Sequence, residues 1–184
     1  MAHFRQILDP ADNAELAELY REIIDGGFGG NAPVNWFTAQ SERPDILAST
    51  WALVQSMLLQ GSLPPTVKQM VLLAISSNNN CQYCRVAHTR ALEALDVPRE
   101  LIDNVTTDLN LAKVPPPQRD ILQFALKTAR DAQSITDRDF QALRNVGLND
   151  GEIMEVAMVA AFTNFINTWA DTSGIEVDAA GPGQ

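Results

Sequence analysis

Both cysteines of the chain and one of its two histidines lie close together, at Cys81, Cys84 and His88. On an α-helix, which turns by ~100° per residue, these three positions fall within an arc of about 60°. Both sulfur atoms and the imidazole would therefore lie on one helix face. This spacing is the feature of the sequence that could carry chemistry, and it is open to three interpretations.

Redox chemistry is the first interpretation. The asparagines at 78–80 would cap the helix that carries the cysteines, and the positive end of its dipole would favour a thiolate. His88, one turn after Cys84, is placed to accept the thiol proton. Cys81, one turn before Cys84, is placed to close a disulfide. The ~5–6 Å between Cβ atoms three residues apart on a helix means that this bond requires local adjustment.

Metal binding and a purely structural role are the other two interpretations. Cys81, Cys84 and His88 would supply three ligands, whereas structural zinc sites use four. Only His3 and scattered acidic residues remain to provide the fourth ligand. In the structural interpretation, the cysteines are small buried side chains and the histidine is a hydrogen-bonded core residue.

The elements that position this motif are expected to be helices, because no sustained alternation of apolar and polar residues predicts a strand. Pro and Gly residues and short polar caps divide the chain into eight or nine helices with short connections, an all-α fold. Thr136 and Asn149 each precede an acidic residue by three positions, the spacing of a capping box. The expected helices cover about residues 10–25, 34–41, 44–60, 65–77, 80–95, 98–109 and 117–132, with two more that start after Thr136 and Asn149.

Composition limits the classes of function. The 184 residues carry a net charge of −10 and no basic patch, which argues against nucleic-acid and membrane-surface partners. The N-terminus lacks a secretory signal, and no run of ~18 uncharged apolar residues predicts a membrane span. Two cysteines do not make a secreted disulfide framework, so we expect a cytoplasmic protein. We expect one domain over residues 1–175 and a disordered tail over 176–184.

The chain resembles the alkylhydroperoxidase D and carboxymuconolactone decarboxylase-like superfamily, especially its peroxidase-related branch. The resemblance extends from about Leu19 to Ile175 and depends most on the Cys-x-x-Cys-x-x-x-His core at residues 81–88. Further matching pieces are the Gly-Gly-Phe-Gly-Gly-Asn-Ala-Pro-Val-Asn-Trp-Phe segment, Arg-Pro-Asp-Ile-Leu at 43–47, and Gly-Leu-Asn-Asp-Gly-Glu-Ile at 147–153.

The resemblance implies a compact helical fold that assembles into homo-oligomers and reduces hydroperoxides, an antioxidant activity of the peroxiredoxin type. By position, Cys84 matches the cysteine that attacks the peroxide, Cys81 the resolving cysteine, and His88 the histidine of the proton relay. Electrons would come from a thiol or lipoyl-type donor, with no bound cofactor or metal. The decarboxylase branch of the superfamily lacks the cysteine pair. Decarboxylation is therefore the activity that the resemblance supports less well.

One position departs from the family pattern. Gln69 stands twelve residues before Cys81, where the family usually carries Glu. An amide can hydrogen-bond His88 or orient a water, but it cannot accept the relayed proton. Gln69 is equally open to a structural interpretation, and Tyr83 is open to three roles: pocket wall, hydroxyl donor or packing residue.

The expected function is therefore a thiol-dependent hydroperoxide reductase or disulfide reductase that uses Cys84, Cys81 and His88. The alternative is a non-catalytic or redox-sensing helical module of the same superfamily.

Overall fold

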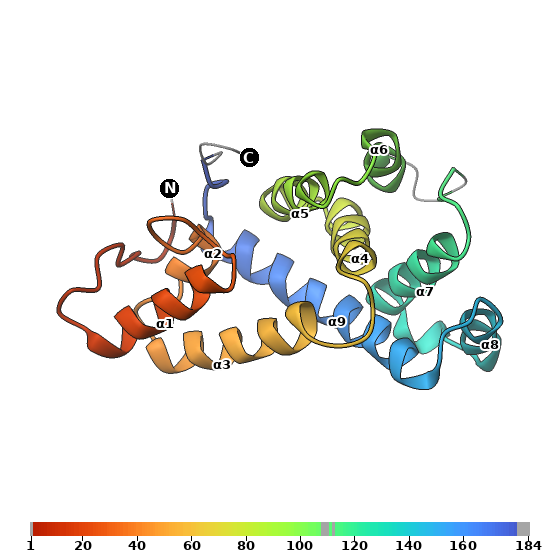
Figure 1. The fold of residues 1–184 in the computed structure, drawn as a ribbon, viewed down its shortest axis with the longest axis horizontal. Coiled ribbons are helices and arrows are strands. Elements are labelled where there is room, and N and C mark those ends of the chain that lie inside the picture. Colours follow the sequence, from red (N-terminus) through yellow and green to blue (C-terminus); the bar gives the residue numbers. More distant parts are fainter. Residues whose placement is uncertain (1, 108–110, 112, 180–184) are drawn as a thin grey trace.

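The chain folds into helices that pack around one long C-terminal helix (Figure 1). A computed structural model describes residues 2–107, 111 and 113–179. This part of the chain contains nine α-helices, one π-helical turn (η1) and one 3₁₀ turn (η2), and no strand, so the expected all-α class is confirmed. The elements are α1 (Ala14–Asp25), α2 (Asn35–Thr38), α3 (Pro44–Val54), η1 (Gln55–Leu59), α4 (Pro65–Asn78), α5 (Gln82–Ala94), α6 (Arg99–Thr107), α7 (Gln118–Arg130), η2 (Ala132–Ser134), α8 (Asp137–Asn145) and α9 (Asp150–Ser173).

Capping explains where several helices begin and end. The two predicted capping boxes are present, with Thr136 before α8 and Asn149 before α9. The Asn149 side chain accepts a hydrogen bond from Glu152 N at 3.0 Å, and the Glu152 carboxylate accepts one from Asn149 N at 2.8 Å. Gly174 ends α9 in the left-handed conformation, with φ of 62°, which a residue without Cβ adopts at little cost.

The first helix begins later than the sequence predicts. Asp9 and Pro10 form a turn instead of an N-cap, because the Asp9 carboxylate accepts a hydrogen bond from Ala11 N two residues on. The N-cap is Asn13, whose side chain accepts from Leu16 N at 3.0 Å.

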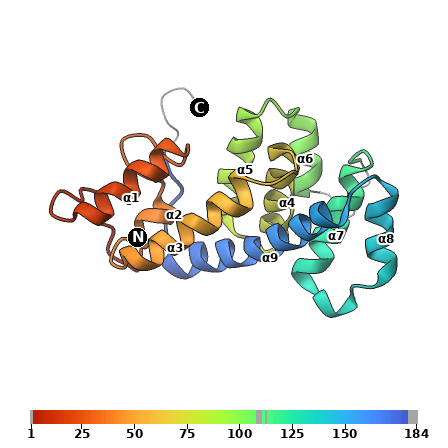
Figure 2. The same cartoon turned by 60° about the horizontal axis from the view of Figure 1, so that its bottom comes forward.

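The centre of the core is α4, which packs against α5, α7 and α9. Figure 2 shows α4 between α5 and the length of α9, with α3 running beside α9. Eight of the 14 residues of α4 are buried, in a continuous run from 70 to 76 together with Lys68. A helix that is apolar on nearly all sides must be enclosed by its neighbours. The packing of α4 against α5, α7 and α9 provides this enclosure.

Lys68 is the charged exception on α4, with 2% of its side chain exposed. Its Nζ lies 2.6 Å from Glu155 on α9 and donates to the carbonyl of Gln60. Glu155 also accepts from Ser62 N at 3.0 Å and from Leu63 N at 3.2 Å. Burial raises the pKa of Glu155, but the hydrogen bond from Lys68 and those from the two backbone amides outweigh it and lower the pKa below its ordinary value. The pair thereby joins α4, α9 and the turn after η1.

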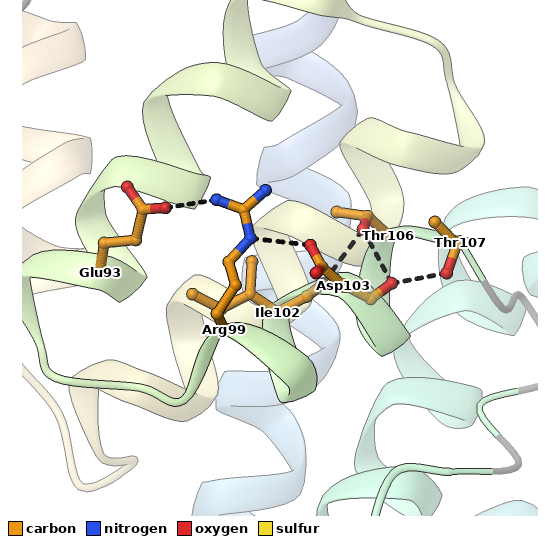
Figure 3. A network of polar contacts seen from close by, with 6 residues as sticks. All are labelled: Glu93, Arg99, Ile102, Asp103, Thr106 and Thr107. Atoms are coloured by element: carbon orange, nitrogen blue, oxygen red, sulfur yellow. Dashed lines mark hydrogen bonds and ion pairs between the residues drawn. The ribbon is translucent and has the colours of Figure 1, made fainter.

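At the outer edge of the fold the ion pairs are exposed to solvent, unlike the buried pair of Lys68 and Glu155. Arg99, at the start of α6, contacts Glu93 on α5 at 2.7 Å and Asp103 at 2.9 Å (Figure 3). These side chains line an open polar groove of about 670 Å³ between α5 and α6.

The C-terminal segment differs from the expected tail. Residues 176–179 follow α9 and make hydrogen bonds to α2 and α5, because Asp178 offers both its carboxylate and its carbonyl to donors there. Residues 180–184 lie outside the described part of the chain, as do residues 108 and 109 at the end of the helix expected over 98–109. None of the helices described has the length and apolar composition that a membrane crossing requires.

We predict that Glu155→Leu lowers the free energy of unfolding by about 3–5 kcal/mol, because it leaves the buried ammonium of Lys68 without a counter-charge. Urea unfolding followed by circular dichroism measures this. Asp103→Ala, which breaks an exposed ion pair, is the matched control and should cost about 0–1 kcal/mol. Adding Lys68→Met to Glu155→Leu should recover most of the loss. Equal effects of Glu155→Leu and Asp103→Ala would contradict the importance given to the buried pair.

Candidate active site

The cysteine motif lies at the junction of α4 and α5. Cys81 is the N-cap residue of α5 in an extended conformation, and Cys84 lies in the first turn of the helix. The backbone reverses at Asn80, which has a φ of 57°, and Cys81 N then donates to Ser76 O at 3.1 Å. The predicted arrangement of both cysteines within one helix is therefore wrong for Cys81.

The asparagine run does not cap α5. No side chain makes a cap hydrogen bond at this helix start, since Asn78 still belongs to α4 and Asn79 is its C-cap. The Asn79 amide instead donates to Asn164 and Asn167 on α9, both at 2.9 Å. Asn79 thus joins α4 to α9 instead of stabilising a thiolate as a cap.

Both cysteines are free and buried. A hydrogen bond with Cys81 raises the pKa of the Cys84 thiol, and burial raises it further. The expectation that the helix N-terminus would favour a thiolate is therefore wrong for Cys84 in this environment. The physical reason is that removal from water disfavours the charged sulfur.

His88 is held by Gln69 across the α4–α5 interface. Its Nδ1 lies 2.9 Å from Gln69 Oε1. Because an amide oxygen only accepts, Nδ1 carries the proton and Nε2 keeps its lone pair. Nε2 is buried without a hydrogen-bond partner, and burial lowers the pKa of His88 to about 4. The imidazole is therefore neutral at pH 7, with a basic nitrogen available.

Cys84 and His88 line the same cavity, of about 80 Å³. Water needs roughly 10–15 Å³ of such space, so a small ligand fits here. The walls are mostly apolar and come from five elements and the loop before α2: Phe28, Val34, Trp36, Phe37, Val54, Leu58, Tyr83, Ala87 and Ile166. The site thus joins one thiol and one imidazole in apolar surroundings.

Tyr83 is a wall of this cavity whose hydroxyl is already engaged. It donates to Asp178 Oδ2 at 2.5 Å and accepts from Trp36 N at 3.3 Å. Burial raises the pKa of Tyr83, and the neighbouring Asp178 carboxylate raises it further. Of the three roles left open for this side chain, the geometry favours the pocket wall.

Two polar residues that contribute to this region could not be identified from the sequence. Asp178 lies 95 residues from Tyr83, and Asn167 lies 91 residues from its partner Ser76. No local spacing links such positions. Asn167 had only the weak signal of a polar residue within an apolar helix.

Metal ligation finds little support in the geometry. Within residues 2–107, 111 and 113–179, no three His, Cys, Asp or Glu side chains form a group that could hold a metal ion.

Comparison with known proteins agrees with this architecture. The model of the carboxymuconolactone decarboxylase family matches residues 44–109, the segment that holds Gln69, both cysteines and His88. Among curated proteins, none matches the sequence significantly.

Three solved structures illustrate the similarity of fold. One is the alkylhydroperoxidase AhpD core of an uncharacterised peroxidase-related protein from Ralstonia eutropha, with 29% identity, a TM-score of 0.80, and coverage of 88% of this chain and 86% of that one. A peroxidase-related protein from a Silicibacter species has 27% identity, a TM-score of 0.80, and coverage of 97% and 96%. The debrominase Bmp8, bound to a tribromopyrrole, has 16% identity, a TM-score of 0.79, and coverage of 97% and 95%, and is similar in fold alone.

The matched segment contains the whole cysteine and histidine motif, and the same all-helical fold extends over nearly the full length of the peroxidase-related relatives. The family match over residues 44–109 and the two peroxidase-related structures support the resemblance of this chain to the alkylhydroperoxidase D and carboxymuconolactone decarboxylase-like superfamily.

Proposed function

We propose that the protein is a thiol-dependent hydroperoxide reductase, with Cys84 as nucleophile, Cys81 as resolving cysteine and His88 as general base. One observation carries the proposal. His88 and Cys84 line the same cavity, the Nε2 atom of His88 is buried without a hydrogen-bond partner, and Gln69 holds the opposite ring nitrogen. Nucleophilic catalysis needs a base with a free lone pair that can take the proton of the nucleophile directly or through a water, and a shared cavity offers room for this.

The first step is attack on the peroxide. The Cys84 thiol gives its proton to His88 Nε2, and the thiolate attacks the terminal oxygen of the hydroperoxide. The O–O bond breaks, and the departing alkoxide takes the proton from His88 to become an alcohol. Cys84 is oxidised to a sulfenic acid.

The second step closes the disulfide. The Cys81 sulfur attacks the Cys84 sulfur, the S–O bond breaks, and hydroxide leaves with the Cys81 proton as water. The sum is one hydroperoxide and two thiols converted to an alcohol, water and a disulfide. Cys81 is the N-cap of the helix that carries Cys84 in its first turn, and this closeness in the chain supports the step.

An external thiol or lipoyl-type dithiol would reduce the disulfide and complete the cycle. We further propose that the protein acts in the cytoplasm, where thiols are kept reduced. We also propose that the chain assembles into a homo-oligomer. The proposal includes neither a nucleic-acid partner nor a membrane partner, in keeping with the net charge of −10.

A redox-sensing module without turnover is the second candidate. The burial of Cys84 and the raised pKa of its thiol favour it, because both slow the attack on peroxide. The two candidates differ in whether oxidation is catalytic, and the cysteine variants distinguish them.

We expect Cys84→Ser to abolish peroxide consumption, whereas Cys81→Ser should permit one oxidation per chain and stop at a sulfenic acid on Cys84. Peroxide consumption and mass spectrometry of the trapped sulfenic acid measure this. Thermal unfolding controls for folding. If both folded variants are equally inert toward peroxide, the assignment of roles fails. If the wild type itself reacts only once with a dithiol in excess, the sensing module is the better description.

Gln69→Glu should raise the rate of peroxide turnover. A carboxylate beside Nδ1 raises the pKa of His88 and gives the relay a proton acceptor. We expect an increase of about tenfold or more, within the ~10²–10⁴ that general acid–base assistance contributes. Gln141→Glu adds the same charge at an exposed position on α8 and should change nothing. Unchanged pH profiles of turnover and of Cys84 alkylation in a folded Gln69→Glu variant would show that Gln69 is not coupled to the site.

The proposed base also makes stability depend on pH. Burial lowers the pKa of His88 from 6.5 to about 4. Between these values the unfolded chain binds more protons at this residue than the folded chain does. The free energy of unfolding should therefore be highest above pH 6.5 and fall as the pH drops toward about 4. Urea unfolding at several pH values should give a smaller fall for His88→Gln. An equal fall in both proteins would mean that His88 does not titrate in this way.

A further inference from the structure

The segment that follows α9 lies against the elements that form the cavity of Cys84 and His88. Figure 1 shows it leaving the end of α9 and passing beside α2. Ile175 is buried and Val177 is half-buried against the core, so residues 175–179 are packed on the fold. The chemistry proposed above gives this segment no role.

Asp178 makes polar contacts with two separate elements. Its Oδ1 accepts from Asn35 N, the first amide of α2, at 2.7 Å. Its Oδ2 accepts from the Tyr83 hydroxyl on α5 at 2.5 Å, and its carbonyl oxygen accepts from the Arg90 side chain at 2.7 Å. One carboxylate therefore joins α2 to α5.

The two elements joined by this carboxylate are walls of the cavity. Val34, Trp36 and Phe37 line it from α2 and the residue before it. Tyr83 lines it from α5, and the Tyr83 hydroxyl also accepts from Trp36 N at 3.3 Å. A chain of hydrogen bonds thus runs from Asp178 through Tyr83 to Trp36, and it holds the two walls against each other.

We propose that residues 175–179 form a strap across these two walls, and that Asp178 is the positioning residue that keeps the cavity closed to bulky molecules. The closed cavity has about 80 Å³ of space for a ligand. The strap therefore limits the size of the molecules that reach Cys84. Its consequence for hydroperoxides rests on the proposed function, whereas its control of access to the thiol does not.

Other contacts of α2 indicate that release of the strap opens the site locally. Trp36 is also anchored to α9, because its indole nitrogen donates to Ile166 O at 3.1 Å and its carbonyl accepts from the Trp169 indole at 3.1 Å. These two bonds do not involve Asp178 and remain when it is replaced. A local opening of this kind needs less free energy than global unfolding and exposes only the groups nearby.

The experiment measures how fast Cys84 reacts with two thiol reagents, in a Cys81→Ala parent so that one thiol reports. Methyl methanethiosulfonate is the small reagent and N-phenylmaleimide the bulky one. Asp178→Ala removes both carboxylate acceptors, and Asp178→Asn keeps one of them. Asp12→Ala is the matched control, because it removes an exposed carboxylate from the turn before α1. Amide hydrogen exchange of the same proteins locates the opening.

We expect Asp178→Ala to speed the reaction with the bulky reagent by about tenfold or more, because lost hydrogen bonds to a charged acceptor favour opening. The gain with the small reagent should be smaller, since this reagent fits the closed cavity. Asp178→Asn should lie between Asp178→Ala and the parent, and Asp12→Ala should match the parent. Amide exchange should become faster in α2 and stay unchanged in α7.

Tyr83→Phe tests the same link from the side of α5, because it removes the hydroxyl and keeps the ring. It should also speed the reaction with the bulky reagent. Since Asp178 and Tyr83 share one hydrogen bond, the double variant should gain less than the product of the two single effects. Fully multiplicative effects would show that the two residues act separately and would contradict the strap.

Unchanged reaction rates in a folded Asp178→Ala variant would overturn the inference. So would an equal gain with both reagents or faster exchange in α7, because the whole fold would then be looser. With peroxides, Asp178→Ala in the chain that keeps both cysteines should raise kcat/KM for cumene hydroperoxide relative to that for hydrogen peroxide, and an unchanged ratio would refute the size limit. A wild type that consumes no peroxide would refute the proposed function, while the reagent rates would still decide the role of the strap.

Discussion

The interface between α4 and α9 is the constraint on which the rest of the structure depends. Two buried polar contacts cross it: the Lys68–Glu155 ion pair at 2.6 Å and the Asn167–Ser76 hydrogen bond at 2.9 Å. Apolar packing alone is nondirectional and tolerates small shifts of one helix along another. Two directional contacts, eight residues apart on α4, prevent both sliding and rotation. Breaking either one would leave a polar group buried without a partner.

This fixed register places the chemistry on the other face of α4. Gln69 follows Lys68 directly, so it points away from α9 and toward α5, where it meets His88. The turn between α4 and α5 then brings Cys81 back to the carbonyl of Ser76. The same helix therefore anchors the core through one set of residues and orients the imidazole and a cysteine through another.

The apolar surroundings of the site shift the pKa values of its two reacting groups in opposite directions. Burial raises the pKa of Cys84 and lowers that of His88, so the neutral thiol and neutral imidazole are the resting forms. In the proposed mechanism, transfer of the Cys84 proton to His88 creates a thiolate and an imidazolium. The Gln69 amide holds the imidazole and offers an oriented dipole without the desolvation cost of a buried carboxylate.

The sequence by itself determined the all-helical class, the capping boxes at Thr136 and Asn149, and the place of Cys84 and His88 on one helix. These depend on hydrogen bonds and side-chain periodicity within a few residues. The resemblance added the position of Gln69. Only the tertiary structure decided that Cys81 lies before its helix and that the asparagines at 79 and 80 belong to a turn and an interhelical network. It also decided that Asp178 contacts Tyr83 and that Asn167 contacts Ser76. Those contacts join residues up to 95 positions apart, and they follow from how buried helix faces pack together, which no local pattern encodes.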